Sequence, residues 1–313
     1  MDAPATKPQD LDGRTILITG ANTGIGYWCA ESLAARGARV LLGCRSAERA
    51  ATAVDAIRLH VPDADLGVVG LDLGSLDSVR RAAAEIGERL DAVICNAGVK
   101  SARRDAKTSD GLDLMMGTNF LGHFALVARL EPLLADDARV VAVGSLAHRF
   151  ARIDPGELSR PWKGSSLRRY GRSKAALMAF VFELDRRWSG TGRSAVCAHP
   201  GYAVDPLTAP RPGSVEVSAA LRRLAALSRP FVQGKDDGAA PVIHAATAAG
   251  VQSGDYWGPS GKLEFRGTPA RVAVSAEVRS ADTGAALWPA AEQLTGVRFP
   301  LDGMSDAPTT LGS

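Results

Sequence analysis

Tyr170 and Lys174 are the residues whose types and spacing most directly suggest chemistry. They stand four positions apart in a stretch with a helical pattern, so both side chains should project from one face of a helix. A tyrosine hydroxyl has an ordinary pKa of about 10, and a neighbouring ammonium should lower that pKa by favouring the phenolate. The reversible reduction of a carbonyl requires a proton donor or acceptor of this kind. The spacing alone is weak, because any surface helix can present it.

Ser145 adds a third group to this pair. It follows the apolar run 139–143, which reads as a buried strand, so its hydroxyl should lie at the carboxyl end of that strand. A hydroxyl placed there can donate a hydrogen bond to the negative oxygen that develops on a substrate. The three residues together predict proton transfer to or from a substrate oxygen, with Tyr170 as the acid or base.

A glycine-rich turn is the second feature with chemical meaning. Residues 19–26 read Thr-Gly-Ala-Asn-Thr-Gly-Ile-Gly, directly after the first apolar run and before a helical pattern. Glycines let the backbone turn close to a pyrophosphate, and the N-terminus of the following helix offers free N–H groups. The spacing differs from the Gly-x-Gly-x-x-Gly of long-chain dinucleotide enzymes, and an ordinary strand-to-helix turn is the alternative. Its place after the first strand favours a dinucleotide site.

The end of the second apolar run indicates which dinucleotide binds. An NAD-selective site usually has an acidic residue there, which binds the ribose 2′-hydroxyl. This sequence has Arg45 followed by Ser46 instead. A guanidinium can pair with the 2′-phosphate that a carboxylate would repel. A solvated arginine at a helix start is the alternative, but the missing acid and the present base both favour NADP(H).

Apolar runs that alternate with helical patterns must position these groups. Near-continuous apolar runs are typical of strands buried on both faces of a parallel sheet. They cover residues 14–19, 38–43, 67–71, 92–95, 139–143 and 194–198, and helical patterns cover 24–36, 46–60, 75–89, 109–135 and 166–188. The alternation predicts an α/β fold in which a doubly wound, Rossmann-type parallel sheet carries helices on both faces. We expect a single domain over residues 11–301, with ligands at the carboxyl ends of the strands.

The combined motifs resemble the short-chain dehydrogenase/reductase superfamily. The resemblance rests on the glycine turn, on residues 96–98 (Asn-Ala-Gly), and on Asn119, Ser145 and the Tyr170/Lys174 pair. Residues 121–124 (Leu-Gly-His-Phe), 145–148 (Ser-Leu-Ala-His) and 199–201 (His-Pro-Gly) are similar to its retinol-dehydrogenase-like and WW-domain-oxidoreductase-like branch. The resemblance covers residues 12–300.

Membership of this superfamily would give the residues specific roles. Tyr170 would be the acid/base, Lys174 would hold the nicotinamide ribose, Ser145 would orient the substrate oxygen, and Asn119 would keep a water in a proton relay. Asp72 would lie against the adenine. The cofactor contacts that the resemblance implies are Gly20, Asn22, Thr23, Gly24, Ile25, Gly26, Arg45, Ser46, Asp72, Leu73, Asn96, Ala97, Gly98, Tyr170, Lys174, Pro200 and Gly201.

Three positions depart from the pattern of that superfamily. Cys95 replaces the usual asparagine before Asn96, which should affect packing more than chemistry, and Gly144 replaces a frequent serine. Asp205 stands where relatives commonly place a threonine that contacts the carboxamide or a phosphate. An aspartate can accept a bond from the carboxamide N–H but repels phosphate, so it does not suit an anionic cofactor.

Residues 202–235 form a long excursion after the sixth run. Val217, Leu221, Leu224 and Leu227 recur there at helical spacing, which predicts a short amphipathic helix. Its apolar stripe could be core, a dimer surface or a substrate lid, and we favour the lid because in the resembling family this excursion borders the substrate pocket. Residues 1–10 and 302–313 read as flexible tails. Many relatives dimerise through helices equivalent to 109–135 and 166–188, whereas the nearest branch includes monomers, so a homodimer is one expected state.

Composition argues against several other classes. The net charge is only +3 and the basic residues are scattered along the chain, which gives no indication of a nucleic-acid or anionic-membrane partner. No apolar run approaches the roughly 20 residues of a membrane span, and the N-terminus lacks the apolar core of a signal peptide, so we expect no membrane anchor. The four cysteines are far apart and suggest reduced thiols in the cytoplasm. His123, His148 and His199 lack ligand spacing, and we expect no metal site.

The favoured hypothesis is an NADP(H)-dependent ketoreductase or alcohol dehydrogenase that acts on a lipophilic or bulky small molecule. A nicotinamide-dependent epimerase or dehydratase uses the same Tyr/Lys pair, but it resembles an extended family with different glycine spacing and a larger C-terminal domain. A non-catalytic NADPH-binding protein is the third hypothesis, and the intact set of Ser145, Tyr170 and Lys174 argues against it.

Overall fold

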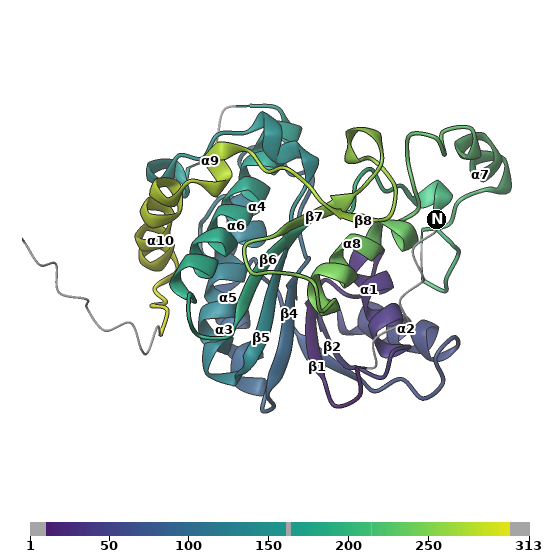
Figure 1. Cartoon of the computed structure of the whole chain (residues 1–313), viewed down its shortest axis with the longest axis horizontal. Coiled ribbons are helices and arrows are strands. Elements are labelled where there is room, and N and C mark those ends of the chain that lie inside the picture. Colours follow the sequence, from purple (N-terminus) through teal and green to yellow (C-terminus); the bar gives the residue numbers. More distant parts are fainter. Residues whose placement is uncertain (1–10, 161–163, 214, 301–313) are drawn as a thin grey trace, which may run out of the picture.

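A computed structural model describes residues 11–160, 164–213 and 215–300. The predicted tails 1–10 and 302–313 lie outside the described residues. Within the described part, an eight-stranded sheet runs through the molecule in the order β3-β2-β1-β4-β5-β6-β7-β8, as Figure 1 shows. All neighbouring strands pair in parallel except β7 and β8, which are antiparallel. The strand order reverses between β1 and β4, which is where ligands bind in doubly wound sheets. The prediction of a doubly wound, Rossmann-type α/β fold is therefore confirmed.

The strands are β1 (Thr15–Thr19), β2 (Arg39–Cys44), β3 (Leu66–Gly70), β4 (Leu90–Cys95), β5 (Leu134–Val143), β6 (Ser194–Ala198), β7 (Tyr256–Pro259) and β8 (Pro269–Arg271). The helices are α1 (Gly24–Ala34), α2 (Ala47–Arg58), α3 (Leu76–Glu85), α4 (Leu114–Met116), α5 (Gly122–Leu130), α6 (Ser166–Arg187), α7 (Ala219–Ala226), α8 (Lys235–Thr247), α9 (Ala276–Arg279) and α10 (Ala281–Thr295). Serines cap five of these helices, as local chemistry would favour. The hydroxyls of Ser46, Ser75, Ser165, Ser218 and Ser280 each accept a backbone N–H of the first turn.

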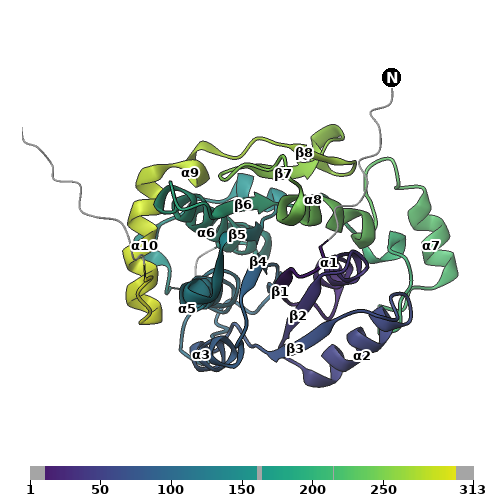
Figure 2. The ribbon, with the colours of Figure 1, turned by 60° about the horizontal axis from the view of Figure 1, so that its bottom comes forward.

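Helices cover both faces of the sheet, and each face buries its own apolar core (Figure 2). One core lies under α1, α2 and α8, and the other lies under α3, α5, α6 and α10. On the second face Trp288 of α10 packs its ring 5.4 Å from that of Phe124 in α5 and 5.7 Å from that of Phe180 in α6. The C-terminal helix α10 therefore packs on α5 and α6 at this face.

The predicted helix over 109–135 is wrong at both ends. Residues 109–113 form a turn because Gly111 has a positive φ of 80° and Asp113 caps α4 by accepting the N–H of Met116 at 2.9 Å. A π-helical turn, Gly117–Leu121, separates α4 from α5. After α5 a short 3-10 segment over residues 131–133 leads into β5, which begins at Leu134. Leu134 and Ala135, the last two residues of the predicted helix, therefore belong to a strand.

The excursion over residues 202–235 contains the predicted amphipathic helix as α7. In both Figure 1 and Figure 2, α7 lies at the periphery, away from the helical layers. None of its residues is buried. Leu221, Leu224 and Leu227 of the predicted stripe are all exposed, so the stripe is not part of the core.

The four cysteines lie inside the two cores. Cys29, Cys44, Cys95 and Cys197 are all buried and free. Burial raises the pKa of the Cys44 thiol to about 11 and that of Cys95 to about 12. These thiols stay protonated near neutral pH.

Among the described residues, no helix is both long enough and apolar enough to cross a membrane.

Candidate active site

Three positions of the glycine turn after β1 require glycine. Gly20 and Gly24 have φ values of 66° and 62°, in the left-handed region that other residues avoid. A methyl group on Gly26 would lie 2.4 Å from the carbonyl oxygen of Gly20. Thr23, at the N-terminus of α1, makes no side-chain cap hydrogen bond. The first N–H groups of α1 therefore point into a tight cradle suited to an anion such as a pyrophosphate.

Thr19 joins this turn to β4 through a buried hydrogen-bond network. Its hydroxyl oxygen accepts the backbone N–H groups of Asn96 and Ala97, each at 2.9 Å, and lies 2.8 Å from Nε2 of His123. Nδ1 of His123 donates to the carbonyl of Asn119 at 2.9 Å, so Nε2 is the acceptor for the threonine hydroxyl. Burial lowers the pKa of His123 to about 3, which keeps this hydrogen-bond pattern unchanged at neutral pH.

Asn96 adds its side chain to the same junction. Its Nδ2 donates to the carbonyl of Thr19 at 2.8 Å and approaches that of Gly20 at 3.3 Å. The ends of β1 and β4 are thus tied together at the strand-order reversal, where the cofactor contacts were predicted.

Asn119 lies in the π-helical turn and is completely buried. Its Oδ1 accepts the N–H of Val99 at 2.7 Å, while Nδ2 donates to the carbonyl of Val99 at 3.0 Å and to the hydroxyl of Ser173 at 2.8 Å. A methyl group on Gly98 would lie 3.2 Å from Oδ1 of Asn119 and 3.4 Å from Nζ of Lys174. The structure therefore brings Gly98, Asn119 and Lys174 together, and the asparagine fixes the loop after β4 to α6.

Ser145 and Tyr170 meet at the carboxyl edge of the sheet. Ser145 begins a 3-10 turn over residues 146–150 after β5, and its Oγ accepts the N–H of Ala147 at 3.2 Å. Burial raises the pKa of Tyr170 to about 12, and a hydrogen bond with the Ser145 hydroxyl opposes this rise. The expectation that Lys174 lowers the pKa of Tyr170 is therefore wrong for this state of the protein, because the cost of burying a phenolate dominates.

Lys174 itself is the most perturbed cation of the site. Its Nζ donates to the carbonyl of Val143 at 2.7 Å, in a position that is almost completely buried. Burial, together with the charge of Lys100, lowers the pKa of Lys174 to about 7. The pKa of Lys100 is also lowered, by burial and by the charge of Lys235. These ammonium groups interact across one cleft, which therefore favours an anionic ligand.

Lys235, at the start of α8, was missed by the sequence analysis. It pairs with Asp205 at 2.5 Å, and a methyl group on Gly24 would lie 3.9 Å from its Nζ. The negative charge of Asp205 is therefore balanced beside the glycine turn, which removes the conflict with an anionic cofactor. Thirty residues of excursion separate the two partners, so no local pattern could have indicated the pair.

The residues predicted to hold the adenosine end lie along the ends of β2 and β3. Arg45 is exposed and has no hydrogen bond or ion pair within the described residues, and Ser46 caps α2. Asp72 accepts the N–H of Gly74 at 2.9 Å through its Oδ1, and Leu73 is buried against Gly122. Arg45 is therefore free to meet a phosphate.

Pro200 and Gly201 follow β6 on the other side of the cleft. The carbonyl of Pro200 accepts Nε2 of Gln233 at 2.9 Å, and Gly201 has a φ of 64°. A small pocket, open to solvent, adjoins the glycine turn between α1 and the excursion. Its walls include Asn22, Thr23, Gly24, Asp205, Arg211 and Lys235.

The three conspicuous histidines make local hydrogen bonds rather than a ligand cluster. Nδ1 of His148 donates to the carbonyl of Ser145 at 2.7 Å, and Nε2 of His199 lies 3.1 Å from a carboxylate oxygen of Glu264. No group of three or more metal-ligating side chains occurs in the part of the chain that the structure describes.

Comparisons with known proteins agree with this architecture. The family model for short chain dehydrogenases matches residues 14–212. Human retinol dehydrogenase 12 is 35% identical over 92% of this chain and 88% of its own length, and the WW domain-containing oxidoreductase of Gallus gallus is 35% identical over 91% of this chain and 69% of its own. The crystal structure of an uncharacterised protein from Mycobacterium paratuberculosis superposes with a TM-score of 0.77 at 34% identity, covering 94% of this chain and 97% of that one. The chain belongs to the short-chain dehydrogenase family, in its retinol-dehydrogenase-like branch.

Proposed function

We propose that the protein is an NADP(H)-dependent oxidoreductase that interconverts a carbonyl and an alcohol on a lipophilic or bulky small molecule. The observation that carries this proposal is the meeting of Ser145, Tyr170 and Lys174 at the carboxyl edge of the sheet, beside a glycine turn that fits a pyrophosphate.

Residues of this chain would bind the dinucleotide at its pyrophosphate, its 2′-phosphate and its nicotinamide ribose. The N–H groups of α1 and the ammonium of Lys235 would hold the pyrophosphate, and Arg45 would hold the 2′-phosphate. Lys174 would turn from Val143 to the nicotinamide ribose. When bound, the nicotinamide supplies or accepts the hydride.

The proton chemistry favours reduction. With a pKa of about 12, Tyr170 keeps its proton at neutral pH and can donate it to a substrate carbonyl oxygen as negative charge develops there. The Ser145 hydroxyl, already in contact with Tyr170, would donate a second hydrogen bond to the same oxygen. Asn119 positions Val99 and Ser173 around this centre and would keep the water of the proposed relay.

The preference for NADP(H) over NAD(H) rests on the end of β2. Arg45 is unpaired within the described residues, and a glycine and a buried cysteine precede it where a carboxylate would select NAD(H). We also propose that the protein works in the cytoplasm, where its four free thiols would stay reduced.

NADPH oxidation measured against a panel of ketones, aldehydes and quinones tests the proposal. We expect turnover that Tyr170→Phe reduces by about a thousandfold while NADPH still binds. Arg45→Ala should weaken NADPH binding and leave NADH binding unchanged. Sustained turnover in Tyr170→Phe would contradict the mechanism. NADPH binding without turnover on any carbonyl would favour the non-catalytic alternative, and conversion of a sugar nucleotide without net NADPH oxidation would favour the epimerase.

A further inference from the structure

The loop over residues 260–268, between β7 and β8, has a strained backbone. In the described chain, Leu263 and Glu264 are the only residues other than glycine with a positive φ, at 57° and 58°. Two such residues in succession are costly for side chains with a Cβ, and they persist only where surrounding contacts enforce them. Strain of this kind concentrates at functional sites. The contacts that hold Glu264 therefore indicate what the loop does.

The carboxylate of Glu264 binds a histidine and an arginine from two other segments. One oxygen lies 3.1 Å from Nε2 of His199, and the other accepts a hydrogen bond from Nη2 of Arg149 at 2.6 Å. Nδ1 of His199 accepts the backbone N–H of Gly201 at 3.2 Å, so Nε2 carries the ring proton and donates it to Glu264. Burial raises the pKa of the Glu264 carboxyl, but the hydrogen bonds from His199 and Arg149 outweigh burial and hold that pKa below its usual range. Glu264 is therefore an anion at neutral pH that bridges the two segments.

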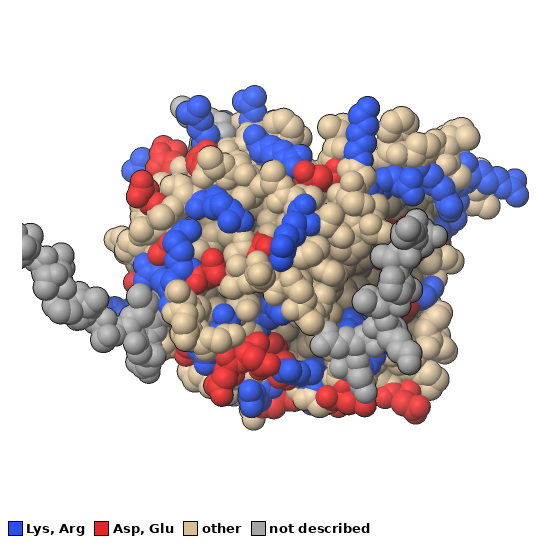
Figure 3. Space-filling view, in the orientation of Figure 1, with Lys and Arg blue, Asp and Glu red and all other residues tan. Residues whose placement is uncertain are grey.

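Arg149 connects Glu264 to the turn that carries Ser145. It lies in the 3-10 segment Leu146–Phe150, which Ser145 caps, and Nδ1 of His148 donates to the carbonyl of Ser145 at 2.7 Å. Within the described residues, Arg149 pairs with no other carboxylate. In Figure 3 blue side chains project from the upper margin of the molecule, and the largest red patch lies along the lower one, so carboxylates are sparse on the side of this turn. Glu264 therefore holds the far end of the Ser145 turn.

The same loop packs closely against the segment that follows β6. A methyl group on Gly201 would lie 2.9 Å from the carbonyl oxygen of Glu264 and closer still to that of Phe265. The carbonyl of Phe265 also accepts the backbone N–H of Tyr202 at 2.8 Å. The loop therefore fixes a segment that contains two of the predicted cofactor contacts, Pro200 and Gly201.

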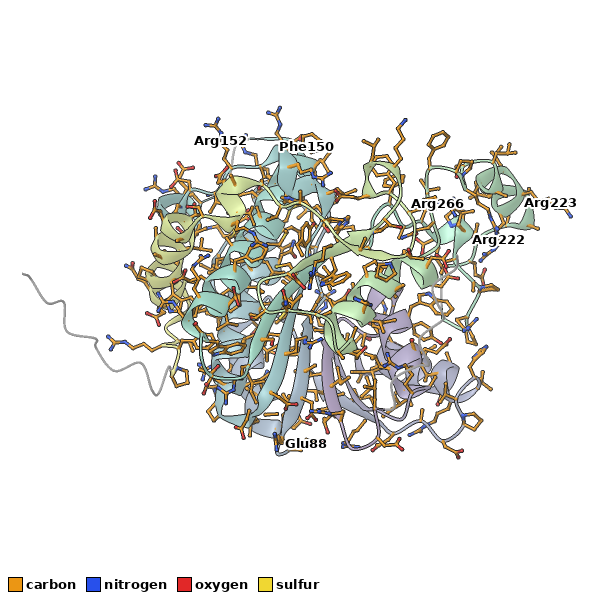
Figure 4. All side chains as sticks on the ribbon, in the orientation of Figure 1. Glu88, Phe150, Arg152, Arg222, Arg223 and Arg266 are labelled. Atoms are coloured by element: carbon orange, nitrogen blue, oxygen red, sulfur yellow. The ribbon has the colours of Figure 1, made fainter. Side chains whose placement is uncertain are left out.

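The bridged segments lie at one edge of the sheet. Figure 4 shows Phe150, at the end of the Ser145 turn, and Arg266, in the loop between β7 and β8, on the upper side of the molecule, with Glu88 at the opposite margin. The strands β5, β6 and β7 are neighbours in the sheet. From its loop after β7, Glu264 reaches the end of β6 and the turn after β5, so it joins the carboxyl ends of three consecutive strands.

We propose that Glu264 is a positioning residue that fixes the substrate oxygen relative to the nicotinamide. Ser145 would orient that oxygen from the side of β5, and Pro200 and Gly201 would contact the nicotinamide end of the cofactor from the side of β6. Hydride transfer must bring these two partners together, and a misplacement of about 1 Å can slow such a reaction about a hundredfold. Glu264 contacts neither partner and acts through the two side chains that it binds. The effect on hydride transfer rests on the proposed function, whereas the effect on cofactor binding does not need turnover.

Glu264→Gln and Arg149→Met are the test variants, and Asp255→Asn is the matched control. Asp255 precedes β7, whereas Glu264 follows it, and Asp255 also pairs with an arginine, Arg271, at 3.0 Å. Arg149→Lys keeps the cation and is the conservative variant. The pair of Glu264 and Arg149 is partly exposed, and pairs of this kind add little to stability, so we expect all four variants to fold. Circular dichroism checks that they do.

Binding of two ligands to the full chain, without substrate, tests the cofactor side of the proposal. One ligand is NADPH, and the other is adenosine 2′,5′-bisphosphate, which carries the 2′-phosphate but no nicotinamide. Glu264→Gln should weaken NADPH binding about fivefold, as expected for the loss of about one hydrogen bond at the nicotinamide end. Binding of the bisphosphate and the binding stoichiometry should not change. Unchanged NADPH binding, or equal weakening of both ligands, would overturn the proposal.

Turnover of a carbonyl compound that the wild type reduces tests the effect on hydride transfer. We expect Glu264→Gln and Arg149→Met to lower kcat about tenfold with KM changed less than about twofold, and Arg149→Lys to retain most of the activity. A higher KM with unchanged kcat would make Glu264 a substrate-binding group and would overturn the proposal, as would an equal loss of kcat in Asp255→Asn. A wild type that reduces no carbonyl compound would contradict the proposed function, and the comparison of the two ligands would still decide the role of Glu264.

Discussion

Replacing Lys174 by methionine should make the cofactor-free protein more stable while it removes activity. The ammonium is buried, no carboxylate within the described residues pairs with it, and its pKa is about 7 instead of 10.5. The unfolded chain therefore binds more protons than the folded one between those two pH values, and the free energy of unfolding of the wild type rises with pH across that window. Methionine fills a similar volume and has no charge to desolvate.

The size of the effect follows from the same pKa. Burial lowers the pKa of Lys174 from 10.5 to about 7. At about 1.4 kcal/mol per pH unit, the buried charge lowers the free energy of unfolding by at most about 5 kcal/mol. Loss of the 2.7 Å hydrogen bond to the carbonyl of Val143 costs about 1–2 kcal/mol in return. Below pH 7 we expect the free energy of unfolding of Lys174→Met to exceed that of the wild type by about 3 kcal/mol. This difference should disappear as the pH approaches 10.5.

Urea unfolding of both proteins at several pH values, without cofactor, measures this difference. Lys262→Met, at an exposed lysine, is the matched control and should show no such dependence on pH. A gain for Lys174→Met that does not change with pH would refute the account based on desolvation. A wild type that is more stable than the variant near pH 6 would refute it more directly.

Four further substitutions, one of them with a control variant, test other parts of the site. Thr19→Val leaves the N–H groups of Asn96 and Ala97 without their acceptor and should lower the free energy of unfolding by about 2–5 kcal/mol; a loss under 1 kcal/mol in urea unfolding would mean that the network contributes little. Gly26→Ala places a methyl group 2.4 Å from the carbonyl oxygen of Gly20 and should weaken NADPH binding at least tenfold in a fluorescence titration, whereas Gly87→Ala, with nothing within 4 Å, should not. Lys235→Met should weaken NADPH binding about tenfold and Asp205→Asn should strengthen it; the same direction of change in both variants would contradict a role for Lys235 at the pyrophosphate.

Much of the fold could be predicted because its signals are local. Buried parallel strands are almost wholly apolar, so the six predicted runs locate β1 to β6 with boundaries that differ by a few residues. Glycines that require a positive φ, such as Gly20 and Gly24, are visible as a spacing. Ser145, Tyr170 and Lys174 could be brought together from sequence because the carboxyl ends of parallel strands meet at one edge.

The parts that could not be predicted depend on contacts between distant segments. The π-helical turn at Gly117–Leu121 places Asn119 against Val99 and Ser173, and nothing in the local pattern distinguishes it from an ordinary helix. The Asp205–Lys235 pair closes across thirty residues. The pKa of Tyr170 depends on how completely its surroundings exclude water, which a spacing of four residues does not reveal.

The burial of the cysteines has a practical use in spectroscopy. Thiol reagents such as maleimides react with exposed thiolates, and all four native thiols are buried and free, with pKa values above the ordinary range. The unmodified chain should therefore resist labelling while it is folded, and it needs no cysteine-free background. A fluorophore attached through Leu224→Cys would report the polarity around α7 directly, and the same dye attached through Leu59→Cys would provide the reference signal.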